Sequence, residues 1–122
     1  MSDFLEEATL RPLLDAWQKS IASHDATGVA ALFTEDAVFQ GLHPYTIGRP
    51  GVETYYAGQP AGMTVDYRLL QVRRLGDDAV LGWAEADFTV GPEVRALVNL
   101  TVVAVRTAEG WRIGHYHVSP RV

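Results

Sequence analysis

The sequence predicts an α+β roll, with three N-terminal helices packed on a strongly curved antiparallel sheet that encloses a cone-shaped pocket. Helix-like periodicity is confined to the first half of the chain. The second half contains long strand-like runs separated by short turns, which is typical of an antiparallel meander. The 122 residues, of which 48% are apolar, suffice for one hydrophobic core, so we expect a single domain over residues 1–122.

Apolar side chains at steps of three and four predict the first helix, and this stripe should be buried against the sheet: Leu10, Leu13, Leu14, Trp17 and Ile21. Thr9 is the expected N-cap, with Pro12 in the first turn, where a missing N–H costs little. The segment from Asp3 to Ala8 can add a further turn or two, since Asp3 and Glu6 have capping-box spacing.

Two shorter helices and a short strand should follow. Asp25 is the expected cap of a second helix that runs to Phe33. A strand over Ala37–Gly41 comes next. Pro50 suits the start of the third helix, which Gly58 would end.

The remaining elements are four strands of roughly ten to thirteen residues, longer than the usual five or six. Strands of this length bend, and Gly82 and Gly114 are the expected positions of bulges. The predicted bounds are Thr64–Leu75, Ala79–Val90, Val94–Arg106 and Trp111–Ser119.

The strand Val94–Arg106 is apolar on both faces, with Val98, Leu100 and Val102 on one and Leu97, Val103 and Val105 on the other. A sheet that is covered on one side only should alternate apolar and polar residues. We therefore expect a second copy of the chain to cover the other face and form a homodimer.

Composition excludes several classes of partner. A net charge of −5 argues against nucleic acid and anionic membranes, which attract basic patches. The chain has no cysteine, which excludes disulfides, a thiolate nucleophile and cysteine-based zinc sites. Neither a basic-then-apolar leader nor a bilayer-length apolar run is present. We expect a cytoplasmic protein without a cofactor.

Two histidines near the C-terminus are candidates for proton transfer. His115 and His117 alternate with Tyr116, so they are expected to share a face with Trp111 and Ile113. If that face lines the cone, the imidazoles meet an apolar cavity and can act as general acid or base. Alternatively, His115 is a core histidine bonded across strands and His117 lies at the rim. Because no third ligand has a recognisable spacing, no metal site is expected.

The carboxylates of the strand Ala79–Val90 leave two alternatives open, because Glu85 and Asp87 share one face with Trp83. In the first, Trp83 lines the pocket, and Asp87 is a buried acid or base with a raised pKa that partners His115. In the second, the small apolar face packs inward and both carboxylates face solvent or a partner copy.

Aromatic residues of the helices and first strand are either core residues or ligand contacts. A tyrosine hydroxyl at the mouth of an apolar pocket can orient a small ligand. His43, in a loop rich in Gly and Pro, is either a lid residue or a surface histidine. The expected ligand-binding residues are Trp17, Phe39, Tyr55, Tyr56, Trp83 and His117.

Four features carry a resemblance to a known family: the helix stripe, segment 31–39, Gly48-Arg49-Pro50-Gly51-Val52, and Gly110-Trp111-Arg112-Ile113 with His115. On these features, over residues 8 to 119, the chain resembles the superfamily of nuclear transport factor, ketosteroid isomerase and SnoaL-like polyketide cyclases. It is most similar to the small bacterial proteins grouped with SgcJ and EcaC, and to the association domain of calmodulin-dependent kinase. The resemblance implies the α+β roll, but the scaffold carries enzymes, binding proteins and dimerisation modules.

The resemblance also implies that the isomerase activity is absent. It places the general-base aspartate of ketosteroid isomerase at Gly41 and the tyrosine oxyanion donor at Trp17. The second, protonated aspartic acid would lie on Val94–Arg106, which contains no Asp.

We therefore expect a protein that binds a small, apolar, polyketide-like metabolite. Its chemistry would be a cofactor-free cyclisation, isomerisation or dehydration, with His115 as base or acid and Asp87 as its partner. The alternative is a non-catalytic module for ligand binding or dimerisation.

Overall fold

The computed structural model describes residues 4–92 and 94–121. Six strands form one curved sheet in the order β2-β1-β6-β5-β4-β3. Strands β1 and β6 pair in parallel, and the other neighbouring strands pair antiparallel. This architecture confirms the predicted fold class. The elements are α1 (Phe4–Ala22), α2 (Ala26–Ala30), β1 (Phe33–Gln40), β2 (Tyr45–Ile47), α3 (Arg49–Ala57), β3 (Met63–Gly76), β4 (Ala79–Val90), β5 (Val94–Thr107) and β6 (Gly110–Pro120).

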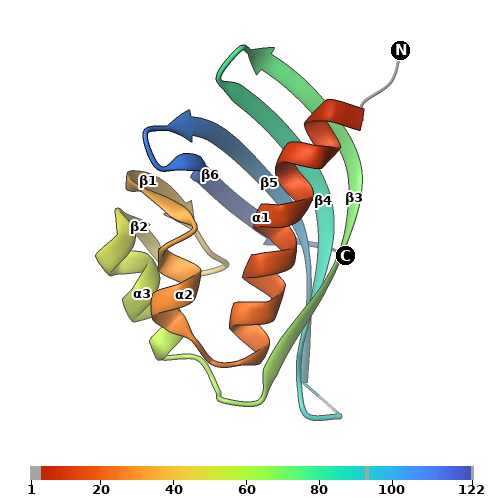
Figure 1. The fold of residues 1–122 in the computed structure, drawn as a ribbon. Helices are drawn as coiled ribbons and strands as arrows, with labels where there is room; N and C mark the ends of the chain where they lie inside the picture. Colours follow the sequence, from red (N-terminus) through yellow and green to blue (C-terminus); the bar gives the residue numbers. More distant parts are fainter. Residues whose placement is uncertain (1–3, 93, 122) are drawn as a thin grey trace.

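Helix α1 lies across one face of the bent sheet, while α2 and α3 lie beside β1 and β2 (Figure 1). We call the face that α1 covers the inner face, and the opposite one the outer face. The predicted apolar stripe of α1 is buried against the inner face, and Trp17 at its centre is 0% exposed. Across residues 4–92 and 94–121, no helix has the length and hydropathy that a bilayer-spanning segment needs.

The start of α1 differs from the prediction. Thr9 does not cap the helix, because its hydroxyl donates to the carbonyl of Leu5 one turn earlier, as Thr often does inside helices. Glu6 and Glu7 lie in the true first turn, where acidic side chains interact favourably with the helix dipole. Pro12 consequently lies inside the helix. The proposed capping residue Asp3 lies outside the described residues.

The second helix is capped as predicted, because the Asp25 carboxylate accepts a hydrogen bond from the Gly28 N–H. It ends at Ala30 rather than at Phe33, which instead begins β1. Helix α3 ends at Gly58, as expected. Strand β2 was not predicted, since its three residues are too few to show a period.

The two glycines expected at bulges behave differently. On β6, Ile113 pairs with Ala104 and His115 with Val103, so Gly114 is the extra residue of a bulge. The expectation for Gly82 is wrong, because β4 keeps a regular register there. A Cβ at Gly82 would lie 2.7 Å from Leu10 Cδ1, so this glycine allows α1 to approach the sheet closely.

Four tyrosines have raised pKa values. Burial raises the pKa of Tyr55, Tyr56 and Tyr116. Burial, together with the hydrogen bond donated to Asp15, raises the pKa of Tyr67 to about 12. The folded state therefore favours the neutral phenols more than the unfolded state does.

We expect alkaline destabilisation from these groups. The free energy of folding that the neutral tyrosines contribute is fully present below about pH 10, the pKa of tyrosine in the unfolded chain. It is lost as pH rises through the higher pKa values of the folded state. The urea midpoint should therefore fall between pH 10 and about pH 12. Circular dichroism can follow unfolding while absorbance follows phenolate formation. A midpoint that stays constant over this range would contradict the prediction.

Candidate functional site

A cavity of about 470 Å³ lies on the inner side of the sheet, where β1 ends and where the ends of β4 and β6 meet the start of β5. Helix α3 and the segment that follows it close another side. This volume lies within the usual range of small-molecule sites. The cavity is lined by Gly41, Leu42, His43, Pro44, Tyr55, Gln59, Pro60, Met63, Phe88, Val90, Ala96, Val98, Tyr116 and Val118.

The cavity wall is mainly apolar and carries few polar groups. The polar side chains among the lining residues are the tyrosines Tyr55 and Tyr116, the amide of Gln59 and the imidazole of His43. No carboxylate or guanidinium group is found among these lining residues. Because an unpaired charge is costly to bury, the wall favours a neutral and largely apolar ligand.

Three side chains form a buried hydrogen-bond relay that ends at the cavity. The indole N–H of Trp17 donates to the Tyr56 hydroxyl at 3.1 Å, and Tyr56 donates to the Tyr116 hydroxyl at 3.4 Å. An indole N–H can only donate, so the Tyr56 oxygen accepts from Trp17, and the Tyr56 proton goes to Tyr116. The Tyr116 hydroxyl donates to no acceptor in the described part of the chain. A ligand oxygen in the cavity would complete the relay.

Aromatic packing holds the Tyr116 ring in place. The ring stacks on Phe39 with centroids 4.5 Å apart and planes 9° apart. It also meets the edge of Trp17 at 6.1 Å. Burial raises the pKa of both Tyr56 and Tyr116, so the two hydroxyls keep their protons at neutral pH. Tyr116, which lines the cavity, therefore carries a fixed and neutral hydroxyl group.

The loop at the mouth of the cavity is braced from the neighbouring strand. The N–H of Gly41 donates to the carbonyl of Pro44 at 2.9 Å. The side-chain amide of Gln40 donates to the carbonyls of both residues. This turn places Leu42 and His43 among the lining residues. Histidine is the side chain best suited to proton transfer near neutral pH.

The expectation that His115 shares a face with Ile113 is wrong. The bulge at Gly114 reverses the alternation of side chains along β6. Ile113 is buried on the inner face, whereas His115 lies on the outer face with His117, their ring centroids 6.2 Å apart. Tyr116 takes the position in the cavity that was expected for His115.

Asp87 also lies on the outer face, which decides between the two alternatives for β4. The inner face of β4 carries the small apolar residues, including buried Ala84 and Ala86. A hydrogen bond from Arg121 holds the pKa of Asp87 below its usual value, and the charges of Arg68 and Arg95 act in the same direction. The raised pKa of the first alternative is therefore wrong.

His115 and Asp87 are not brought together. His115 is level with Leu81, since both pair with Val103. Leu81 and Asp87 are six residues apart on one strand, which corresponds to about 20 Å. The two side chains do not form an acid–base pair. Among the described residues, no three His, Asp or Glu side chains lie together as a metal site would require.

The aromatic candidates divide into three groups. Tyr55 lines the cavity. Trp17, Phe39 and Tyr56 are buried behind it and hold Tyr116. Trp83, which is 50% exposed, lies on the outer face, and the exposed His117 lies on the same face. Sequence reasoning missed four further cavity residues, Met63, Phe88, Tyr116 and Val118. The alternation of side chains beyond Gly114 could have revealed Tyr116 and Val118.

Comparison with known families decides the classification. The model of the SnoaL-like domain matches residues 10–122. This chain belongs to the SnoaL-like domain family. A comparison with curated protein sequences gives no significant match.

Several solved structures share the fold of this chain. A ketosteroid isomerase-like protein from Erwinia carotovora has a TM-score of 0.81 and 19% identity, covering 96% of this chain and 97% of its own. A proposed dehydratase of the NTF2-like family from Streptomyces avermitilis has a TM-score of 0.78 and 21% identity, covering 99% of both chains. A domain of unknown function from Nostoc punctiforme, with a cystatin-like fold, has a TM-score of 0.85 and 16% identity. The match covers 97% of this chain and 78% of that domain.

In this SnoaL-like chain, Gly41 occupies the cavity wall where the resemblance places the isomerase base. A Cβ at this position would lie 3.3 Å from the ring of Pro44. An aspartate there would therefore require the Pro44 ring to move by a few tenths of an ångström.

Proposed function

We propose that this SnoaL-like chain binds a small, neutral, largely apolar ligand whose oxygen accepts a hydrogen bond from Tyr116. The relay from Trp17 through Tyr56 carries this proposal, because it ends in a donor without an acceptor at the cavity. The apolar wall supports a ligand with a flat ring system, since Phe88 and Tyr55 offer aromatic surfaces.

The chemistry that fits this site is cofactor-free proton transfer, as in a cyclisation, isomerisation or dehydration. Tyr116 would stabilise negative charge that develops on the ligand oxygen, which is the effect of a preorganised donor. His43 at the mouth would accept or return the proton. The isomerase-like and dehydratase descriptions of the structural neighbours support this class of reaction.

The test compares two probes that differ in one oxygen, 2-acetylnaphthalene and 2-ethylnaphthalene. Tyr116→Phe removes the donor to the ketone and also the acceptor of the Tyr56 hydroxyl, and the second change is common to both probes. We therefore expect calorimetry to show about ten-fold weaker binding of the ketone, with little change for the hydrocarbon. Tyr45→Phe is the matched control, because Tyr45 is 62% exposed and does not line the cavity. Equal ketone affinity in both variants would contradict the proposal.

A dimerisation module is the second candidate, favoured by the outer face of the sheet. No helix of the described residues covers this face (Figure 1). Trp83 is half exposed on it, and the half-buried side chains of Leu81, Val103 and Val105 lie on the same face. We propose that a second copy of the chain covers this apolar surface.

Sedimentation at micromolar concentration should give twice the 13.4 kDa chain mass. Trp83→Glu should yield the monomer, because it replaces an exposed apolar side chain of this face with a charge. Thr54→Glu, on the exposed side of α3, should leave the mass unchanged. A wild-type monomer would exclude this candidate.

A further inference from the structure

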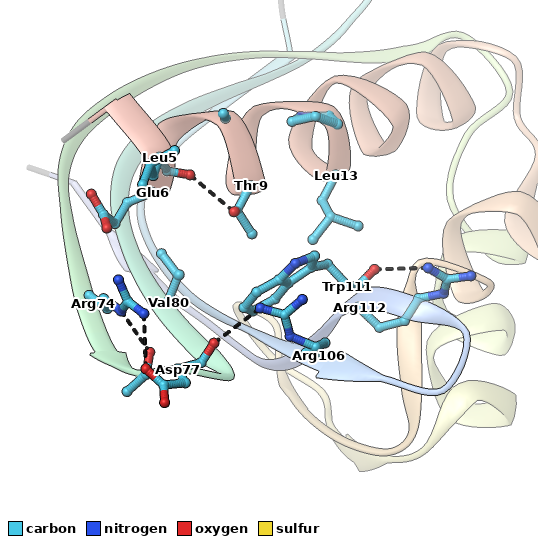
Figure 2. A pocket seen from close by; sticks show the side chains of 13 residues that line it. Leu5, Glu6, Thr9, Leu13, Arg74, Asp77, Val80, Arg106, Trp111 and Arg112 are labelled. Atoms are coloured by element: carbon cyan, nitrogen blue, oxygen red, sulfur yellow. Dashed lines mark hydrogen bonds and ion pairs between the residues drawn. The ribbon is translucent and has the colours of Figure 1, made fainter.

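A groove of about 630 Å³ lies apart from the site above. It runs between the first turns of α1 and the tips of two hairpins, β3–β4 and β5–β6 (Figure 2). We call it the α1 groove. It shares no lining residue with the cavity beside Tyr116.

The floor of the α1 groove is apolar. Leu13 and Val80 are buried beneath it, and the half-buried indole of Trp111 forms one wall. Leu5 is 66% exposed at its edge. An apolar group that entered the groove would remove these surfaces from water, which favours binding.

Guanidinium groups from both hairpins reach the rim of this floor (Figure 2). Arg106 lies over the ring of Trp111, 4.9 Å from its centroid. In Arg74 and Arg106, Nε and Nη2 make hydrogen bonds, whereas Nη1 makes none with the described residues. Arg112 is also a lining residue, but its guanidinium lies away from these two groups and donates to the carbonyl of Trp111 (Figure 2). The rim thus offers free donors above an apolar floor.

The acidic partners of these arginines are weakly held. Arg74 pairs with Asp77, whose side chain is 93% exposed, and Arg106 pairs with the exposed Asp78. Ion pairs in such exposed positions contribute little to stability. Glu6 is a further acid at the groove. A ligand carboxylate could replace Asp77 or Asp78 while its apolar body gains contact with the floor.

We propose that the α1 groove is a second binding site, for a small carboxylate with an aromatic or short aliphatic body. Its carboxylate would lie between Arg74 and Arg106, since planar guanidinium groups bind carboxylates with paired hydrogen bonds. Its body would lie on Val80 and Leu13 beside Trp111. The two sites therefore select ligands of different charge.

The experiment uses 2-naphthoate and calorimetry on the full chain. Arg106→Gln and Arg74→Gln should each weaken binding about ten-fold, and added salt should weaken binding to the wild type. Arg73→Gln is the matched control, because Arg73 is exposed, adjacent in sequence and absent from the groove lining. Circular dichroism of each variant checks folding, and two independent arginines keep the test valid if one variant unfolds.

A variant in which the cavity beside Tyr116 is filled distinguishes binding in the α1 groove from binding at the site of the proposed function. Ala96→Trp fills the cavity beside Tyr116, and 2-naphthoate should bind this variant as it binds the wild type. Loss of 2-naphthoate binding in Ala96→Trp would overturn the second site. So would equal affinity in the Arg106→Gln, Arg74→Gln and Arg73→Gln variants, or no binding to the wild type.

Discussion

Trp17→Ala is expected to lower the free energy of unfolding by about 3–5 kcal/mol. The indole is fully buried and meets Phe88 and Tyr116 edge-on, with centroids 5.9 and 6.1 Å away. Its removal leaves a cavity between α1 and the sheet. It also removes the N–H that donates to Tyr56, which leaves a buried hydroxyl without its donor.

Urea denaturation at one fixed protein concentration measures this effect, because self-association would make stability depend on concentration. Trp17→Phe keeps most of the ring volume and should lose clearly less stability than Trp17→Ala. Thr54→Ala, at an exposed position of α3, is the control and should stay within about 0.5 kcal/mol of the wild type. If Trp17→Ala unfolds at the urea midpoint of the wild type, the packing of the Trp17 ring does not contribute to the free energy of unfolding.

Ala96→Trp is expected to weaken binding of 2-acetylnaphthalene at least about 100-fold, a loss of about 2.7 kcal/mol. Ala96 lines the cavity and pairs with Phe88 across the two strands, so an indole at this position would occupy the space of the ligand. Ala57→Trp, on the exposed side of α3, adds the same side chain away from the cavity and should bind normally. Full affinity in Ala96→Trp would place the ligand elsewhere.

The bounds of the four long strands were predictable because the information is local. The turn residues at Gly76-Asp77-Asp78 and Thr107-Ala108-Glu109-Gly110 separate long strands, and the observed bounds of β3 to β6 differ from the predicted ones by at most one residue. Asp25 likewise marks the start of α2 through its own side chain. These features depend on residues a few positions apart.

The orientation of β6 side chains was predictable in principle but was assigned wrongly. A bulge at Gly114 was expected, and one extra residue is enough to reverse inner and outer faces. An uninterrupted two-residue alternation from Ile113, which ignores the extra residue of the bulge, places His115 on the inner face. An alternation that restarts after Gly114 places Tyr116 and Val118 on the inner face instead, and both residues line the cavity.

Other parts of the site depend on contacts between distant segments. The parallel pairing of Phe39 with Tyr116 joins β1 to the last strand and brings the loop after β1 to the cavity. No local pattern predicts that pairing. The inner face of β4 is selected by α1, since Leu10 packs where Gly82 lacks a side chain.

A crystal structure of the complex with 2-acetylnaphthalene tests the central claim most directly. We predict that the ring system lies between Phe88 and Tyr55, with the ketone oxygen about 2.7 Å from the Tyr116 hydroxyl. The hydrogen bonds from Trp17 to Tyr56 and from Tyr56 to Tyr116 should persist in the complex. A probe found on the outer face, in the α1 groove, or in the cavity with its ketone turned away from Tyr116 would contradict the account.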